Sequence, residues 1–185
     1  NQNCKLIVVA CNTATTNAIS YLRANYNVPF IGIEPAIKPA AINTKSKIIG
    51  ILATKGTLSS GLFHSTTKNF SCFVFTVCKN RSLYQLLESY IKPMLDQGMD
   101  YLVLGCTHYP YLIPLLKKML PEHVTIIDSG EAVARQTKIV LEKNGLLSNA
   151  TKLGSHQFYT NGDETVLSSI IESTTVKYTV QSKDF

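Results

Sequence analysis

The sequence lacks several features that define large classes of proteins. Among its 185 residues, no apolar run reaches the roughly 18 residues that a membrane-spanning helix needs. There is no internal repeat, no low-complexity tract and no Gly/Ser-rich linker. The composition, with 45% hydrophobic and 16% charged residues, is instead typical of a soluble globular protein of one large or two small domains.

Disulfide and metal-binding patterns of cysteine are also missing. The sequence has five cysteines, and no pair of them has C-x-x-C spacing. An odd number argues against the disulfide framework of a secreted protein, so we expect free thiols and a cytoplasmic location. Two of the cysteines, Cys72 and Cys78, are interpreted as small buried hydrophobic residues.

Basic residues outnumber acidic ones, 18 to 12, which gives a net charge of +6. They are scattered in pairs such as Lys45 and Lys47, and aromatic residues are not interleaved with them as in a nucleic-acid-binding surface. We therefore expect a solvated surface, with neither a nucleic acid nor a membrane as partner. A mildly positive field would suit a small anionic substrate.

Short apolar runs alternate with helical patterns along the sequence. Runs such as KIIGILA and DYLVLG are hydrophobic at nearly every position, as in parallel sheets buried on both faces. The alternation predicts an open, doubly wound α/β fold. Strands are expected at 5–10, 29–33, 47–53, 70–77, 100–105, 123–127, 156–159 and 175–180. Helices are expected at 13–25, 35–42, 56–66, 82–97, 111–120, 130–144 and 163–173.

Two cysteines stand where predicted strands end. Cys11 follows LIVVA, and Cys106 follows YLVLG. In doubly wound folds ligands bind outside the carboxyl ends of the strands, so both thiols are expected at a functional edge. A single free cysteine in such a fold is usually a small core residue. Two similar turns, each with a cysteine directly after a predicted strand, favour a functional role for both thiols over burial in the core.

The residues after each cysteine are suited to beginning a helix and binding an anion. Asn12 and Thr13 are both good N-cap residues, and the N–H groups of a helix start can hold a carboxylate and favour a thiolate. Thr107 can cap the helix after Cys106. His108 can bind substrate or influence the protonation of Cys106.

Three other uses of these residues are disfavoured. A metal site from Cys11, Cys106 and His108 would contain a C-x-H spacing that is unusual for zinc. A Cys106–His108 nucleophile pair is not expected, because side chains two residues apart on a chain entering a helix point to different sides. A disulfide between the two cysteines does not suit a reducing compartment. The remaining interpretation is two thiols that act as acid and base from opposite sides of one substrate.

At these residues the sequence resembles the glutamate racemases, cofactor-independent enzymes of the aspartate/glutamate racemase family. The similarity lies, in the family's order, in VVACNTAT, GIEPAIKPA, GILATKGTL, LVLGCTHYPYLIPLL, IIDSGEAVA and FYTNGD. Aspartate racemases look similar around both cysteines but typically have Glu in place of His108, so glutamate is the favoured substrate. The resemblance implies two pseudosymmetric, doubly wound parallel-sheet domains with the active site between them. The first would comprise 1–33 and 128–185, and the second 34–127. A homodimer is an expected assembly.

The resemblance also assigns roles to individual residues. Cys11 and Cys106 would be the proton donor and acceptor, Cys11 working on D-glutamate and Cys106 on L-glutamate. The product D-glutamate would supply peptidoglycan synthesis. No metal and no organic cofactor would take part. The substrate-binding residues would be Asn12, Thr13, Thr107 and His108, and Glu88 would be an accessory residue.

The sequence also departs from the family. A DSGxGG-type turn that carries an active-site Asp and Ser, and a later PYG-type turn, are not found in it. We therefore expect that about the first quarter of a typical member is missing and that the first domain is incomplete. Glu88 lies further from Cys78 than its family counterpart would. Two alternatives follow: a truncated, non-catalytic fragment or amino-acid-binding relative, and a racemase that acts on aspartate.

Overall fold

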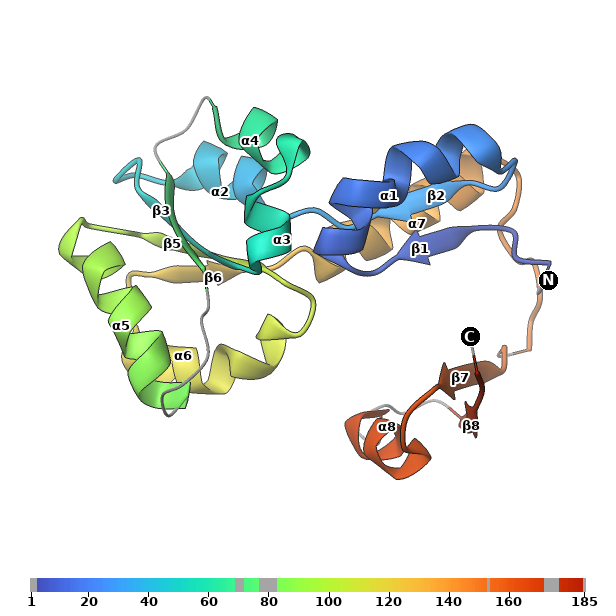
Figure 1. The fold of residues 1–185 in the computed structure, drawn as a ribbon. Helices are drawn as coiled ribbons and strands as arrows, with labels where there is room; N and C mark the ends of the chain where they lie inside the picture. The colour runs from blue at the N-terminus through green and yellow to red at the C-terminus, as the bar shows by residue number, and fades with distance from the viewer. Residues whose placement is uncertain (1–2, 69–71, 77–82, 153, 172–176, 185) are drawn as a thin grey trace. The chain divides into compact units, whose positions relative to one another are not determined.

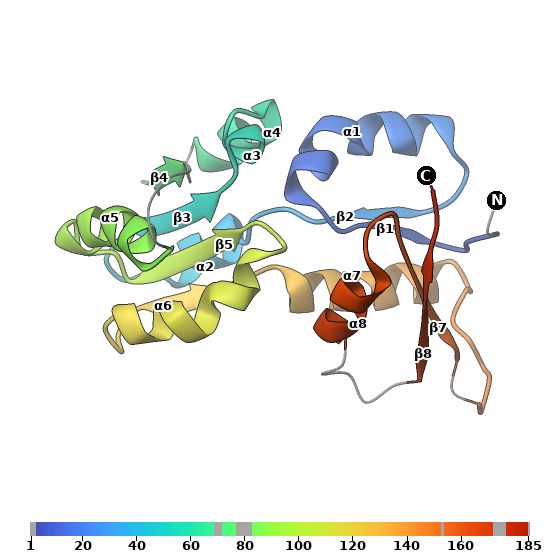
Figure 2. The same cartoon turned by 60° about the horizontal axis from the view of Figure 1, so that its bottom comes forward.

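The computed structural model describes residues 3–68, 72–76, 83–152, 154–171 and 177–184. The chain forms two compact units, Asn1–Leu147 and Ser148–Phe185. Each unit is built from parallel strands connected by helices (Figures 1 and 2). The predicted α/β class with parallel sheets is therefore confirmed.

The first unit begins with a two-stranded parallel sheet. Its strands β1 (Ile7–Val9) and β2 (Phe30–Gly32) are connected by helix α1 (Asn12–Asn25). The buried Thr15 of α1 bridges them, because its hydroxyl donates to the Val9 carbonyl at 3.1 Å and accepts from the Ile33 N–H at 3.1 Å. Gly32 allows this close approach, since a Cβ there would lie 2.4 Å from the Thr15 Cγ2.

A four-stranded parallel sheet, in the order β4-β3-β5-β6, forms the centre of the first unit. Its strands are β3 (Ile49–Ala53), β4 (Cys72–Thr76), β5 (Tyr101–Gly105) and β6 (Thr125–Ile127). All five residues of β3 are buried, which explains the continuous hydrophobic run in the sequence. Cys78, predicted to be buried, lies outside the described residues, and for Cys72 only the backbone in β4 is described, so the predicted burial of both stays a prediction.

Helices cover both faces of this sheet. On one face α2 (Ile37–Asn43), α3 (Lys55–Leu58) and α4 (Gly61–Thr67) pack over Ile49, Ile51 and Val103. On the other, α5 (Leu83–Asp96) and α6 (Ile113–Met119) pack over Leu52, Leu102 and Leu104 (Figure 1). The alternation of side chains along β3 and β5 thus produces two hydrophobic cores, as in a doubly wound sheet.

Two predicted helices are divided in the structure. The helix expected at 56–66 is α3 followed by α4, because the Ser60 hydroxyl accepts a hydrogen bond from the Phe63 N–H and begins a new helix. The helix expected at 111–120 begins earlier, as the 3-10 helix η1 (Tyr109–Leu112), and continues as α6. Pro110 and Pro114 lack the N–H that a continuous α-helix would use.

The first unit ends with α7 (Gly130–Lys143), which follows β6 directly. The Ser129 hydroxyl, buried at this junction, donates to the Glu34 carbonyl. This bond joins the chain segment that leaves β2 to the segment that leaves β6. No helix among the described residues is long and apolar enough to cross a membrane.

The second unit contains β7 (His156–Thr160) and β8 (Tyr178–Ser182), paired in parallel, and α8 (Glu164–Ile171) between them. The rings of Phe158 and Tyr178 meet edge to face at 5.9 Å. The Asp163 carboxylate accepts from the Thr165 hydroxyl and N–H, and these bonds lower the pKa of Asp163. The predicted end of this helix, 172–173, lies outside the described residues.

Hydrogen bonds to Asp100 connect the start of β5 to the loop before β3. Its carboxylate accepts from the Thr44 hydroxyl and from the N–H groups of Lys45 at 2.7 Å and Ser46 at 2.9 Å. Burial alone would raise the pKa of Asp100, but these hydrogen bonds outweigh it and lower the pKa to about 2. Since the folded pKa is lower than the unfolded one, the ionised carboxylate stabilises the fold above pH of about 4.

We predict that Asp100→Asn lowers the free energy of unfolding at pH 7 by about 1 kcal/mol. The amide oxygen of Asn can replace Oδ2 and accept from the two backbone N–H groups, but the NH₂ that replaces Oδ1 cannot accept from the Thr44 hydroxyl, and the negative charge is lost. Solvent screens part of the effect at this half-buried site. As pH falls from about 4 towards 2, wild type loses this stabilisation and the two proteins should converge. Urea unfolding at several pH values measures the difference. Asp96→Asn, at an exposed acid, is the matched control, and an equal loss there would contradict the prediction.

Candidate active site

Polar side chains gather at the carboxyl ends of the strands. Cys106 and Asp128 directly follow β5 and β6, and Thr54 directly follows β3. These strands are parallel, so their carboxyl ends lie at the same edge of the sheet. In the small sheet, Cys11 lies two residues after the end of β1.

Cys11 is itself the N-cap of α1. Its backbone is extended, with φ −145° and ψ 121°, and its Sγ accepts from the Ala14 N–H at 3.5 Å. The prediction that Asn12 and Thr13 cap this helix is therefore wrong, because both already lie in its first turn. Their side chains are consequently available for other contacts. Cys11 is exposed, and its thiol is free.

Asn12 is buried, with only 3% of its surface exposed, and its Oδ1 has no hydrogen-bond partner among the described residues. Buried acceptors are nearly always paired, so this atom is notable. Asn12 lines a cavity of about 70 Å³ together with Cys106 and Thr107. The structure thus brings together three of the residues singled out in the sequence.

Thr13 takes part in a cluster of three hydroxyl groups. Its Oγ1 lies 2.9 Å from that of Thr54 and 3.1 Å from that of Thr57, and these two lie 3.2 Å apart. Thr57 is fully buried. Thr54 and Thr57 were not among the site residues predicted from the sequence. The sequence could have indicated them, since Thr54 follows the buried strand GILA as a helix N-cap, and Thr57 stands three residues later, where its N–H donates the capping hydrogen bond.

Cys106 and His108 lie on the same side of the chain. The distance from the Cys106 Sγ to the His108 Nδ1 is 3.8 Å. The expectation that they point apart is wrong, because the chain does not enter an α-helix here. It makes a turn closed by a 3.0 Å bond from the Tyr109 N–H to the Cys106 carbonyl and continues as η1. Thr107 accordingly caps no helix.

Tyr109 is a neighbour of the second cysteine that was not among the predicted site residues. Burial raises the pKa of Tyr109, and the negative charge that Cys106 and Tyr90 can carry adds to the effect. The phenol therefore stays neutral near the thiol at physiological pH. It packs against the core under α5 and α6.

Glu88 does not line the cavity that holds Cys106. It lies on the exposed side of α5, in a separate surface hollow with Lys92 and Asp96. Within the described residues, this hollow contains none of the other predicted site residues. The accessory role of Glu88 stays a prediction.

The sequence of the chain matches a known family of enzymes. The sequence profile of the family described as Asp/Glu/hydantoin racemase matches residues 1–137. The chain belongs to this family and is an amino-acid racemase, an isomerase. The resemblance noted in the sequence is thereby confirmed.

Within the family, several similar proteins are named glutamate racemases. The glutamate racemase of Pseudomonas putida (strain F1) is 41% identical over 186 aligned positions, which cover 92% of this chain and 70% of that protein. A glutamate racemase isoform from Bacillus anthracis has 31% identity and a TM-score of 0.80, over 98% of this chain and 74% of that one. The Escherichia coli enzyme, solved with L-glutamate and the activator UDP-MurNAc-Ala, has 29% identity and a TM-score of 0.78, over 97% and 74%.

A glycine controls how closely α3 approaches the start of α1. A Cβ added to Gly56 would lie 2.8 Å from the Thr13 Cγ2, which is closer than two carbons can pack. Thr13 cannot easily move away, because its hydroxyl is held by Thr54 and Thr57. A residue larger than glycine would therefore disturb the hydroxyl cluster.

We predict that Gly56→Ala lowers racemase turnover about tenfold or more, because it displaces Thr13 and the helix start beside Cys11. Gly61→Ala is the matched control, since a Cβ at this second helical glycine meets no atom within 4 Å. It should leave turnover within about twofold and can stabilise the fold slightly. Steady-state kinetics of both variants tests this, and equal turnover in the two would contradict it.

Proposed function

We propose that this protein interconverts L- and D-glutamate with two thiols and no cofactor. The observation that carries the proposal is the pair of free cysteines, Cys11 and Cys106, each following a parallel strand and each beside polar hydrogen-bonding side chains. The relatives named glutamate racemases support glutamate as the substrate. His108, which lies beside Cys106, supports glutamate over aspartate through the sequence resemblance.

Racemisation inverts one carbon, so it needs a base on one face and an acid on the other. In one direction the Cys106 thiolate removes the α-proton of L-glutamate. The C–H bond breaks, its electron pair stays on the α-carbon, and an S–H bond forms on Cys106. The Cys11 thiol then gives its proton to the opposite face of that carbon and becomes a thiolate. The reverse direction exchanges the two roles, and no proton or electron is gained or lost overall.

The carbanion is too unstable to form unless fixed donors stabilise the charge that spreads onto the α-carboxylate. Hydroxyl groups of Thr13, Thr54 and Thr57, held in one cluster, offer such donors at one side of the site. Thr107 and the Asn12 amide offer them at the cavity beside Cys106. Because these groups are positioned before the substrate arrives, little reorganisation is needed during the reaction.

The proposal extends to the architecture and the cellular role. The hydroxyl cluster joins a residue of the range 1–33 to residues of 34–127, as expected for an active site between two domains with those bounds. D-glutamate would supply peptidoglycan synthesis in the cytoplasm, and the free thiols of Cys4, Cys11 and Cys106 suit that reducing compartment. The homodimer belongs to the same proposal and rests on the sequence resemblance.

We predict that Cys11→Ser and Cys106→Ser each lower racemisation at least about 10³-fold, because a serine hydroxyl is too weak a base and acid at neutral pH. Cys4→Ser, at an exposed free cysteine, is the control and should stay within about twofold of wild type. Circular dichroism or a coupled assay follows the change of enantiomer. Near-normal turnover in Cys106→Ser would refute the two-thiol mechanism, and an inactive wild type would favour an amino-acid-binding relative.

A second prediction concerns solvent isotope. In D₂O the Cys11 thiol exchanges to S–D before turnover, so the first D-glutamate formed from L-glutamate should carry one deuterium at the α-carbon. The remaining L-glutamate should stay protiated early in the reaction, because the thiol that removes the proton is not the one that returns it. Mass spectrometry after separation of the enantiomers measures both. Deuterium appearing equally in recovered substrate and product would indicate a single base.

A further inference from the structure

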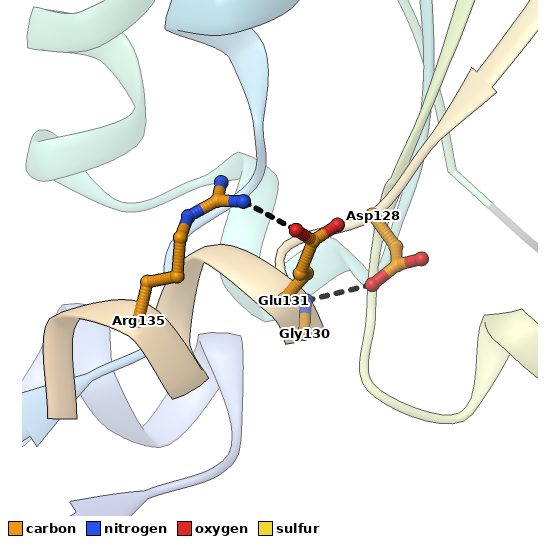
Figure 3. A network of polar contacts seen from close by, with 4 residues as sticks. All are labelled: Asp128, Gly130, Glu131 and Arg135. Carbon is orange, nitrogen blue, oxygen red and sulfur yellow. Dashed lines mark hydrogen bonds and ion pairs between the residues drawn. The ribbon is translucent and has the colours of Figure 1, made fainter. Parts of the chain in front are cut away.

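The cavity beside Cys106 contains one carboxylate that no role described above uses. Asp128 follows β6, the strand next to β5, and lines this cavity together with Cys106, Thr107 and Asn12. Its Oδ1 accepts from the Gly130 N–H at 2.7 Å at the start of α7. The other carboxylate oxygen has no hydrogen bond or ion pair among the described residues, and Figure 3 shows it turned away from Gly130.

Glu131, an acidic residue at the start of the same helix, has a structural partner and serves as a comparison for Asp128. Glu131, three residues further along the chain, forms an ion pair with Arg135 one helical turn away, and both side chains are largely exposed. Figure 3 shows Glu131 directed toward Arg135, whereas Asp128 reaches back to the helix start. Glu131 does not line the cavity. Among the described residues that line this cavity, Asp128 is the one that carries a carboxylate.

A second acceptor in this cavity lacks a partner. The Oδ1 of Asn12 is buried and accepts no hydrogen bond among the described residues. Asp128 and Asn12 thus bring one charged and one neutral acceptor to a cavity whose described lining contains no Lys or Arg. An ammonium group carries a positive charge and three N–H donors, so it can satisfy both acceptors at once.

The size and the field of the cavity agree with such a group. Its volume of about 70 Å³ exceeds the roughly 10–15 Å³ that a cavity needs to hold a water molecule, so it has room for an ammonium group and the carbon that bears it. The start of α7 contributes about half a positive charge. The full negative charge of Asp128 exceeds this partial positive charge, so the electrostatic field at the second carboxylate oxygen, which does not contact Gly130, stays attractive for a cation.

We propose that Asp128, together with the Oδ1 of Asn12, binds the α-ammonium group of the amino-acid substrate and so orients the α-carbon toward Cys106. This inference rests on the proposed function and adds a residue to it. The charge pair would discriminate amino acids from the corresponding dicarboxylates. It would also keep the ammonium protonated next to the carbon that loses a proton, which favours the carbanion electrostatically.

The test compares binding of glutamate with binding of glutarate, which has the same two carboxylates on a five-carbon chain but no amine. In Asp128→Asn the amide oxygen can still accept from Gly130, so the helix start is kept and only the charge is removed. Calorimetry should show glutamate binding weakened about tenfold or more, with glutarate binding unchanged or tighter. Glu131→Gln, the same change of charge outside the cavity, should alter neither.

Each other outcome overturns the inference. Equal weakening of both ligands in Asp128→Asn would mean that Asp128 acts only through the shape of the site. Unchanged glutamate binding, with wild type binding and racemising normally, would reject the ammonium site and leave the proposed function intact. A wild-type protein that neither binds nor racemises glutamate would reject the proposed function, and this inference with it.

Discussion

Parallel strand pairing is the constraint on which the candidate site depends. When β3, β5 and β6 run side by side in one direction, the three chain segments that leave them start at one edge. Thr54, Cys106 and Asp128 stand at those starts, far apart in sequence. The two faces of β3 and β5 pack into two hydrophobic cores, which hold the strands that lead to the polar groups. A reaction that needs an acid, a base and charge-stabilising donors in fixed positions requires such a support.

The contact between α1 and α3 joins this edge to the first cysteine. Three threonine hydroxyls meet there, and Gly56 allows the backbone of α3 to come close enough for the contact to form. Hydroxyl groups can donate or accept, so the cluster satisfies itself in the free protein and can turn its donors toward a carboxylate. The same elements that stabilise the contact would thus bind substrate, which links the stability of this region to its function.

The two cysteines occupy different environments although their sequences look alike. Cys11 caps a helix of 14 residues and accepts from its backbone. Cys106 lies in a turn before a 3-10 helix, with an imidazole at 3.8 Å and a cavity beside it. A racemase must remove and return a proton on two faces of a chiral substrate, which are not equivalent. Unequal surroundings for the two thiols are consistent with that requirement.

The order of strands and helices, the parallel sheet and the place of both cysteines at strand ends were predictable from sequence, because continuous apolar runs and helical periodicity are local properties. The two divided helices depended on one serine hydroxyl and two prolines, which are weak signals beside the hydrophobic pattern. What only the tertiary structure decided is which distant residues meet. Thr13 contacts Thr54 and Thr57 across 41 and 44 residues, and Asn12 shares a cavity with Asp128. Such meetings depend on how sheets and helices pack, and no local pattern in the chain encodes that geometry.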